Sequence, residues 1–440
     1  MSISTLAPAF DLPGFQAFLA AQQEPAWWTS LRQDAFDHFQ RTPWPDRRHE
    51  EWIRSDLRLF QLNRYHAPLA PQAEVDFQSL LSSGAFTSGV ELGGQVLTLD
   101  SFVRQEWLSP ALAAQGVICQ SLQQAANEHS DLVREHLHGA VDYEYDTFAA
   151  LHGAFSSGGQ FVYIPRGCRV ALPLHLGTWL SDGGTDTAHT LIVLEEGAEA
   201  TILHEANSSS REGGGLSLGA LEIIQRPGSH LRYVSLQEQG YKTFQFSHQR
   251  AILDRQATLQ WTLGALGNGF AKVNQSVALV GPGAESQVNG VLFTQGRQHL
   301  AYHTLQHHQA PACRSDFLYK SAQQDQSRTV WRGMIKVDKS AQKTDGYQRN
   351  DNLILSSRAR ADSIPGLEIE ADDVRCTHGS TTARVDEEQI FYAQCRGFTR
   401  NEAVRMIVTG FFQQIFDRIS IESVRDALGL TIARQVREYS

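Results

Sequence analysis

A short pattern recurs along the middle of the chain: a turn residue, then a small or polar residue, then alternating apolar positions. The pattern occurs at Gly167–Val170, Gly197–Ala200, Gly228–Leu231, Gln256–Leu259 and Gly283–Ser286. Successive copies start roughly 30 residues apart, an interval typical of proteins built from stacked repeats. Short β-forming runs such as Thr190–Leu194 and Val277–Val280 lie between the copies. The repeat therefore predicts a mainly β protein made of strand-and-turn units.

Two architectures fit strand-and-turn units that have no helices between them. One is a solenoid, in which each turn buries its inward side chains against its neighbours, and the other is a β-sandwich with tight hairpins. Hairpin dipeptides are few, Asn289-Gly290 being the clear one, and the turns recur at a long, regular interval. We therefore favour a β-helical solenoid, whose open ends need caps that helical flanks would supply.

The distribution of helical and β-type patterns along the sequence predicts three regions: a mostly helical domain over residues 1–150, a β-helix core over 151–385 and a helical domain over 386–440. Helical spacing of apolar residues marks Trp27–Gln40, Ser121–His136 and, near the C-terminus, Val404–Ile419. Thr399 and Glu402 form a capping-box pattern in front of the last of these, and a further helix is predicted over Ile421–Glu438. The apolar face of Val404–Ile419 fits packing on the solenoid and docking of a partner equally well.

Composition excludes several classes of protein. The net charge is -10 and the basic residues are scattered, which argues against nucleic-acid binding. No stretch approaches the ~18–20 apolar residues of a membrane span, and no signal peptide is visible, so we expect a cytoplasmic protein. The cysteines are far apart and form no CxxC pair, which argues against a disulfide framework, a zinc ribbon or a four-thiolate cluster cage; they are Cys119, Cys168, Cys313, Cys376 and Cys395.

Most catalytic signatures are absent or out of context. The chain has no P-loop motif, and Gly215–Gly219 fits G-x-S-x-G without the strand before it and the helix after it that a nucleophile elbow requires. His303, His307 and His308 precede Cys313, but on a strand His308 would point away from the other two. We interpret these histidines as structural or surface residues and predict no catalytic residue.

Cys376 and His378 form the remaining candidate pair. On an extended strand their side chains share one face, about 6–7 Å apart, and a thiolate with an imidazole can bind iron or another soft or borderline metal. Two ligands alone cannot hold a metal cluster tightly, so such a site would be partial, shared or transient. The alternative is an inert cysteine and a hydrogen-bonded histidine at the end of a core strand, which the chemistry alone favours.

From Arg328 to Arg418 the chain resembles the signature of the SufB/SufD family of iron–sulfur cluster assembly proteins. The matching segments are Trp331–Val337, Ala341–Gln348, Asn352–Leu355, Pro365–Ile369, Asp372–Gly379, Phe391–Gly397 and Gly410–Phe412. The Cys-x-His-Gly form of the motif and the length are similar to the SufD branch. SufB-like chains carry a cluster-building cysteine at about the position of Asn350, so this chain resembles the partner of the thiolate donor.

The resemblance implies a right-handed parallel β-helix, a heterodimer with SufB through that β-helix, and docking of the SufC ATPase on the C-terminal helices. It implies a non-ATPase scaffold subunit and a transient iron–sulfur cluster at the SufB interface, with His378 as a ligand or stabiliser and Cys376 beside it. Flavin binding by the complex is left open, since no residue of this sequence supports it. The alternative is a β-helical enzyme acting on a polysaccharide. Such an enzyme needs paired carboxylates on one face, whereas the adjacent Asp372 and Asp373 point to opposite faces.

Overall fold

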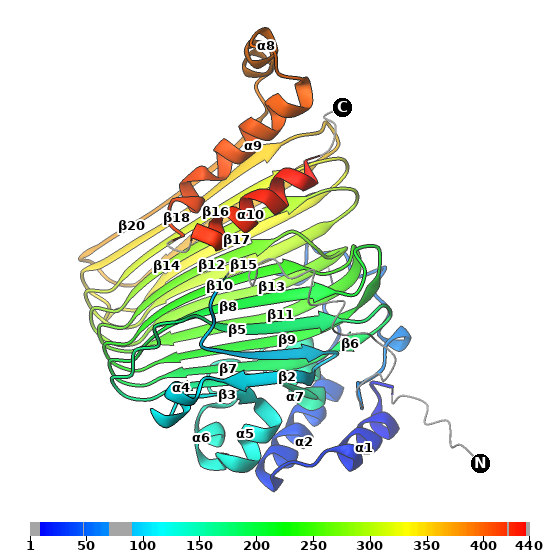
Figure 1. The fold of residues 1–440 in the computed structure, drawn as a ribbon, viewed down its shortest axis with the longest axis vertical. Coiled ribbons are helices and arrows are strands. Elements are labelled where there is room, and N and C mark those ends of the chain that lie inside the picture. The colour runs from blue at the N-terminus through cyan, green and yellow to red at the C-terminus, as the bar shows by residue number, and fades with distance from the viewer. Residues whose placement is uncertain (1–8, 47, 70–89, 420–421, 437–440) are drawn as a thin grey trace.

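The structure is a computed structural model that describes residues 9–46, 48–69, 90–419 and 422–436. Its centre consists of two sheets of ten strands each, stacked face to face (Figure 1). Sheet A runs in the order β2 (Phe102–Leu108), β1 (Gly94–Leu99), β5 (Leu174–Leu180), β8 (Glu199–Ser208), β10 (His230–Glu238), β12 (Thr258–Ala265), β14 (Glu285–Thr294), β16 (Arg314–Gln323), β18 (Thr344–Ile354) and β20 (Val374–Arg384). Sheet B runs in the order β19 (Arg360–Ile369), β17 (Arg328–Val337), β15 (His299–His308), β13 (Phe270–Leu279), β11 (Lys242–Leu253), β9 (Gly214–Gln225), β7 (Ala188–Leu194), β4 (Gly158–Ile164) and β3 (Ile118–Ser121), with β6 (Thr185–Asp186) paired to β9.

From β7 onward, consecutive strands alternate between the two sheets, and neighbours within each sheet are parallel. Each turn of the chain therefore adds one strand to sheet A and one to sheet B, which confirms the predicted parallel β-solenoid. Only β1–β2 and β3–β4 pair antiparallel among the described strands. These first strands, β1 to β3, extend the sheets within a stretch whose sequence pattern predicted mainly helix.

The sequence repeat corresponds to one corner of the solenoid. Residues with φ between +56° and +72° occupy this corner in successive turns, and each donates its backbone N–H to a carbonyl of the next turn over 2.6–3.2 Å; they are Gly167, Gly197, Gly228, Gln256, Gly283, Ala312 and Lys343. The residue that follows each of them is buried and is Cys168, Ala198, Ser229, Ala257, Ala284, Cys313 and Thr344 in turn. Cys168 and Cys313 are thus packing residues. The series continues through Ala312 and Lys343, where no glycine marks the corner, because the hydrogen bonds to the next turn hold the conformation.

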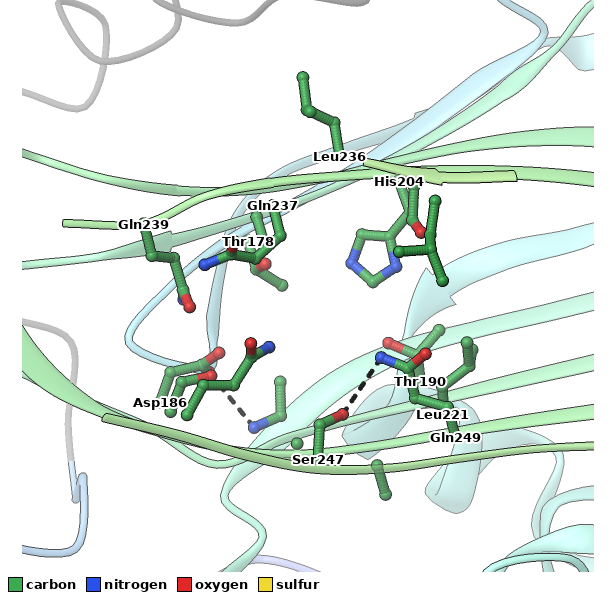
Figure 2. A pocket seen from close by; sticks show the side chains of 18 of the residues that line it. Thr178, Asp186, Thr190, His204, Leu221, Leu236, Gln237, Gln239, Ser247 and Gln249 are labelled. Atoms are coloured by element: carbon green, nitrogen blue, oxygen red, sulfur yellow. Dashed lines mark hydrogen bonds between the residues drawn. The ribbon is translucent and has the colours of Figure 1, made fainter. Parts of the chain in front are cut away.

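The solenoid interior is apolar over much of its length and polar in part. Large buried side chains such as Trp261, Val288 and Phe317 fill it. Between β8 and β10 on one side and β6 and β11 on the other, a cavity of about 90 Å³ is lined by hydroxyl, amide, carboxyl and imidazole groups together with apolar side chains such as Leu221 and Leu263. Figure 2 shows Asp186 and Ser247 on one wall of this cavity and His204 on the other. Burial raises the pKa of the Asp186 carboxyl to about 6.

The N-terminal helices cover the outer face of sheet B and close the first end of the solenoid (Figure 1). They are α1 (Leu12–Ala21), α2 (Ala26–Arg41), α4 (Pro110–Ala114), α5 (Leu122–Glu128), α6 (Ser130–His136) and α7 (Thr147–Phe155), with a 3₁₀ turn at Leu62–Arg64. Phe148 of α7 stacks on Phe246 of β11 with ring centroids 3.7 Å apart. The predicted helix over Trp27–Gln40 is α2, and the one over Ser121–His136 is split at His129 into α5 and α6.

The C-terminal helices lie on the outer face of sheet A. They are α8 (Glu387–Cys395), α9 (Arg400–Phe416) and α10 (Glu422–Gln435); α8 projects beyond the solenoid (Figure 1). The predicted capping box is present, since Glu402 N donates to Thr399 Oγ1 over 3.3 Å and Thr399 N to Glu402 Oε2 over 2.7 Å. Positions 421, 437 and 438 of the helix predicted over Ile421–Glu438 lie outside the described residues.

The apolar face of α9 is buried in the fold itself. Its side chains, Val404, Val408, Phe412 and Ile415 among them, form one cluster with outward side chains of sheet A such as Val291 and Leu318. Of the two uses that the sequence allowed for this face, packing on the solenoid is therefore the one observed. No helix in the described ranges is long and apolar enough to cross a membrane.

We expect Gly228→Ala to lower the free energy of unfolding by roughly 1–2 kcal/mol. A Cβ there has open space, but an L side chain at φ +67° is strained. Gly410→Ala is the matched control: this glycine lies within α9 with open space around an added Cβ, so alanine stabilises it by up to about 1 kcal/mol. Denaturant unfolding followed by circular dichroism measures both variants, and equal midpoints would contradict this account of the corner.

Candidate functional site at the open end of the solenoid

The last turn of the solenoid, β19 and β20, is uncovered on one side. β19 pairs with β17 and β20 pairs with β18, and each is the final strand of its sheet. Within the described residues no strand pairs with their outer edges, so their backbone N–H and C=O groups are free to pair with another chain. We call this surface the open end.

Cys376 and His378 both lie on β20 and face the solenoid interior. They pair in register with Gly346 and Gln348 of β18, which are buried. Register partners in parallel strands point to the same face of a sheet, so both side chains point inward. His378 is nevertheless exposed and Cys376 half-buried, because among the described strands no further turn follows to cover them. The structure therefore brings the two predicted site residues onto one face, as their spacing required.

Two apolar side chains of β19 also face inward at the open end and remain partly exposed. Leu367 and Ile369 pair with Ile335 and Val337, both fully buried, yet they are 38% and 39% exposed. These inward-facing but partly exposed leucine and isoleucine side chains form an apolar patch at the open end, which also carries His378. Such a patch is typical of a surface that another protein covers.

Cys376 is held as a neutral thiol. Its Sγ lies against Gly346, where an added Cβ would be 3.3 Å away, and its side chain packs against the small cluster that contains Ile335 and Val337. Burial raises the pKa of the Cys376 thiol, and the nearby Asp345 carboxylate raises it further. A metal bound there would have to displace the proton, since the thiolate is the ligand form.

Asn350, which the sequence resemblance puts at about the cysteine position of SufB-like chains, lies in β18, one turn inside the open end. Its side chain is 1% exposed. Its Nδ2 donates to Tyr319 O over 3.4 Å, and its Oδ1 accepts from Asn352 Nδ2 over 2.9 Å. Asn352 in turn accepts from Ser321 Oγ over 2.6 Å. Asn350 is therefore part of a buried polar network and offers no thiolate.

The other sequence candidates are not brought together. In the described ranges no group of three or more His, Cys, Asp or Glu side chains surrounds a common metal position. The three clustered histidines have separate partners: His303 lies 2.8 Å from Lys272 Nζ, His307 Nε2 lies 2.9 Å from Asp338 Oδ1, and His308 Nε2 lies 2.8 Å from Ser315 Oγ. Gly215–Gly219 lies inside strand β9 and makes no elbow.

The architecture is that of a parallel β-solenoid with helices on both outer faces and a last turn whose outer edge is unpaired among the described strands. Residues 179–411 match the family described as "SUF system FeS cluster assembly, SufBD core domain", and residues 16–176 match "SufBD protein N-terminal region". The chain therefore belongs to the SufBD family of the SUF iron–sulfur cluster assembly system.

Relatives from both branches of the family are similar to the chain. The iron-sulfur cluster assembly protein SufB of Bacillus subtilis is 25% identical over 91% of this chain and 88% of its own length. The SufD protein of the same organism is 26% identical over 97% of this chain and 98% of its own length. A SufBD family protein of Mycobacterium leprae is 31% identical over 64% of this chain and 74% of its own. Similarity therefore establishes the family without separating its branches.

We expect iodoacetamide at neutral pH to modify Cys395 of the isolated chain faster than Cys376. Cys395 is exposed on α8, whereas Cys376 is half-buried and its raised pKa keeps it protonated. Because that pKa is raised, the Cys376 rate should continue to increase above pH 9. Peptide mass spectrometry with isotope-coded reagent measures each rate, and equal labelling of both cysteines at pH 7 would contradict the packing described for Cys376.

Proposed function

We propose that this chain is the SufD-type, non-ATPase scaffold subunit of a SUF complex and that its open end helps to hold a nascent iron–sulfur cluster against a SufB-type partner. The observation that carries this proposal is the exposure of inward-facing His378 and Cys376 on β20, the last strand of sheet A, whose outer edge has no partner among the described strands. A ligand set that is incomplete in one chain suits a cluster completed across an interface.

The cluster is cargo here, so weak binding is useful. The His378 imidazole can bind iron or hydrogen-bond to a bridging sulfide, and it is exposed enough to do either without rearrangement of the fold. Cys376 becomes a ligand only after losing its proton, which its raised pKa makes unfavourable until a metal approaches. Because His378 can bind at once and Cys376 only after it loses its proton, the pair would hold the cluster weakly. Weak binding favours release of the cluster to an acceptor protein.

Assignment to the SufD branch rests on the buried Asn350 amide and on the sequence Cys376-Thr377-His378-Gly379. The SufB-type partner would lie across β19 and β20, where backbone edges and the exposed Leu367 and Ile369 are available. The SufC ATPase would dock on the C-terminal domain, residues 386–440. There Phe391 and Tyr392 of α8 are 67% and 62% exposed, as suits a contact surface. We place the complex in the cytoplasm.

We expect His378→Ala to leave complex formation intact and to lower cluster assembly by about tenfold or more. The reason is that an exposed side chain at the open end contributes ligand or hydrogen bond, not packing. Anaerobic reconstitution of the co-expressed complex, followed by visible absorption, measures the yield. His230→Ala is the matched control, since His230 is also an exposed histidine of sheet A, but on β10, far from the open end. Equal yields for the two variants would remove His378 from the site.

We expect Leu367→Arg to weaken association with the SufB-type partner by at least about tenfold, because it places a charge in the apolar centre of the proposed interface. Leu172→Arg is the matched control: Leu172 is 37% exposed, as Leu367 is 38%, but it lies beside Gly93 at the other end of the solenoid. Co-purification and size-exclusion chromatography measure association. Loss of the complex in both variants, or in neither, would contradict the proposed interface.

A further inference from the structure

Three histidines from separate parts of the chain meet beneath the N-terminal helices, far from the open end. His138 follows α6, His152 lies in α7 and His189 lies in β7. Their ring centroids are 4.9 Å apart for His138 and His189, 5.3 Å for His152 and His189, and 6.3 Å for His138 and His152. His152 and His189 are 2% and 0% exposed, and His138 is half-buried.

Each ring has one nitrogen facing a group that can only accept a hydrogen bond. His138 Nδ1 lies 3.1 Å from Val141 O, and His152 Nε2 lies 3.3 Å from Ala188 O. A carbonyl oxygen has no proton to give, so these two nitrogens carry the hydrogen. In a neutral ring the other nitrogen is then a bare lone pair.

His189 is oriented in the same way by a carboxylate. Its Nε2 lies 2.9 Å from Glu222 Oε2. Glu222 also accepts three backbone N–H groups, from His138, Ala140 and Val141, over 2.7–2.8 Å. Although burial raises it, the hydrogen bond from His189 and these N–H groups hold the pKa of Glu222 below its ordinary value, so it is an ionised acceptor.

The three remaining nitrogens are buried and have no hydrogen-bond donor among the described residues. They are His138 Nε2, His152 Nδ1 and His189 Nδ1. Burial lowers the pKa of His138 to about 4 and that of His152 well below its ordinary value, so both rings are neutral at neutral pH. Buried acceptors require a partner, and a single water has only two hydrogens to offer to the three nitrogens. A metal ion could accept all three lone pairs.

We propose that His138, His152 and His189 bind one divalent transition-metal ion of the zinc class. Neutral imidazole is a preferred ligand for such ions, and three histidines with an open fourth position form an established type of zinc site. In each histidine the ring nitrogen that would not bind the ion already faces a carbonyl or carboxylate, the arrangement that orients metal-binding histidines. The site goes beyond the proposed function and does not depend on it.

The ion would join three segments: the loop after α6, helix α7 and strand β7, of which the last two are already linked by the contact of His152 Nε2 with Ala188 O. As placed in the structure, the three nitrogens do not surround one point, so the rings must move toward one another on binding. His138 is the most exposed of the three residues, although its free Nε2 is buried. A bound ion would therefore fasten the N-terminal helices to sheet B.

The test uses the chelator-stripped, full-length chain with Cys376→Ser, His378→Ala and Cys395→Ser, so that metal binding at the open end or on α8 cannot contribute. We expect one Co²⁺ per chain, with the visible absorption bands of tetrahedral cobalt, displaced by one equivalent of Zn²⁺. We also expect Zn²⁺ to raise the unfolding temperature, because it binds only the folded state.

His138→Gln and His152→Gln, each in that background, should lower the Co²⁺ affinity by at least about tenfold. His308→Gln is the matched control, since His308 is a buried histidine bonded to Ser315, away from the cluster, and should bind as the parent does. If His152→Gln fails to fold, His138→Gln decides, because its position is half-buried in a loop. A parent that binds no ion, as with ordered water alone, or unchanged affinity in His138→Gln, would overturn the proposal.

Discussion

Every turn of this molecule depends on the backbone hydrogen bonds that it makes with the turns before and after it. A strand in a parallel solenoid satisfies its N–H and C=O groups only through its neighbours, and it buries its inward side chains only against theirs. Even the corners are bonded from turn to turn, from Gly167 to Lys343. At each end of a solenoid, the outermost turn therefore lacks a neighbouring turn on one side, and its backbone groups and inward side chains need another partner there.

The two ends of the solenoid differ in what covers them. At the first end, β3 and Leu112 of α4 join the apolar interior and close it. At the other end the C-terminal helices turn aside onto the outer face of sheet A, where α9 and α10 bury their apolar faces. This leaves β19 and β20 uncovered, with His378 on a strand whose alternation would otherwise bury it. The candidate site is thus a consequence of where the helices pack.

The two roles that we propose for histidines in this chain follow from their different surroundings. His378 is exposed and free to meet a cluster carried by another chain. His138, His152 and His189 are clustered beneath the N-terminal helices, and their protons are directed outward to carbonyls and to Glu222. The first arrangement suits transient cargo, and the second suits an ion that stays. Both follow from burial and from which nitrogen already has a partner.

The sequence by itself determined the solenoid, because glycine marks four of the five copies of the repeated corner, and it determined that Cys376 and His378 share a face, because strand alternation has a period of two. It could not show the corners at Ala312 and Lys343, the strands β1 to β3, or the packing of α9, since hydrogen bonds and burial from distant segments impose these. Nor could it show that the site stays uncovered or that His138, His152 and His189 meet. The spacing of those three residues in the sequence matches no metal-binding motif. Only the packing of α7 and the loop after α6 on sheet B brings them together.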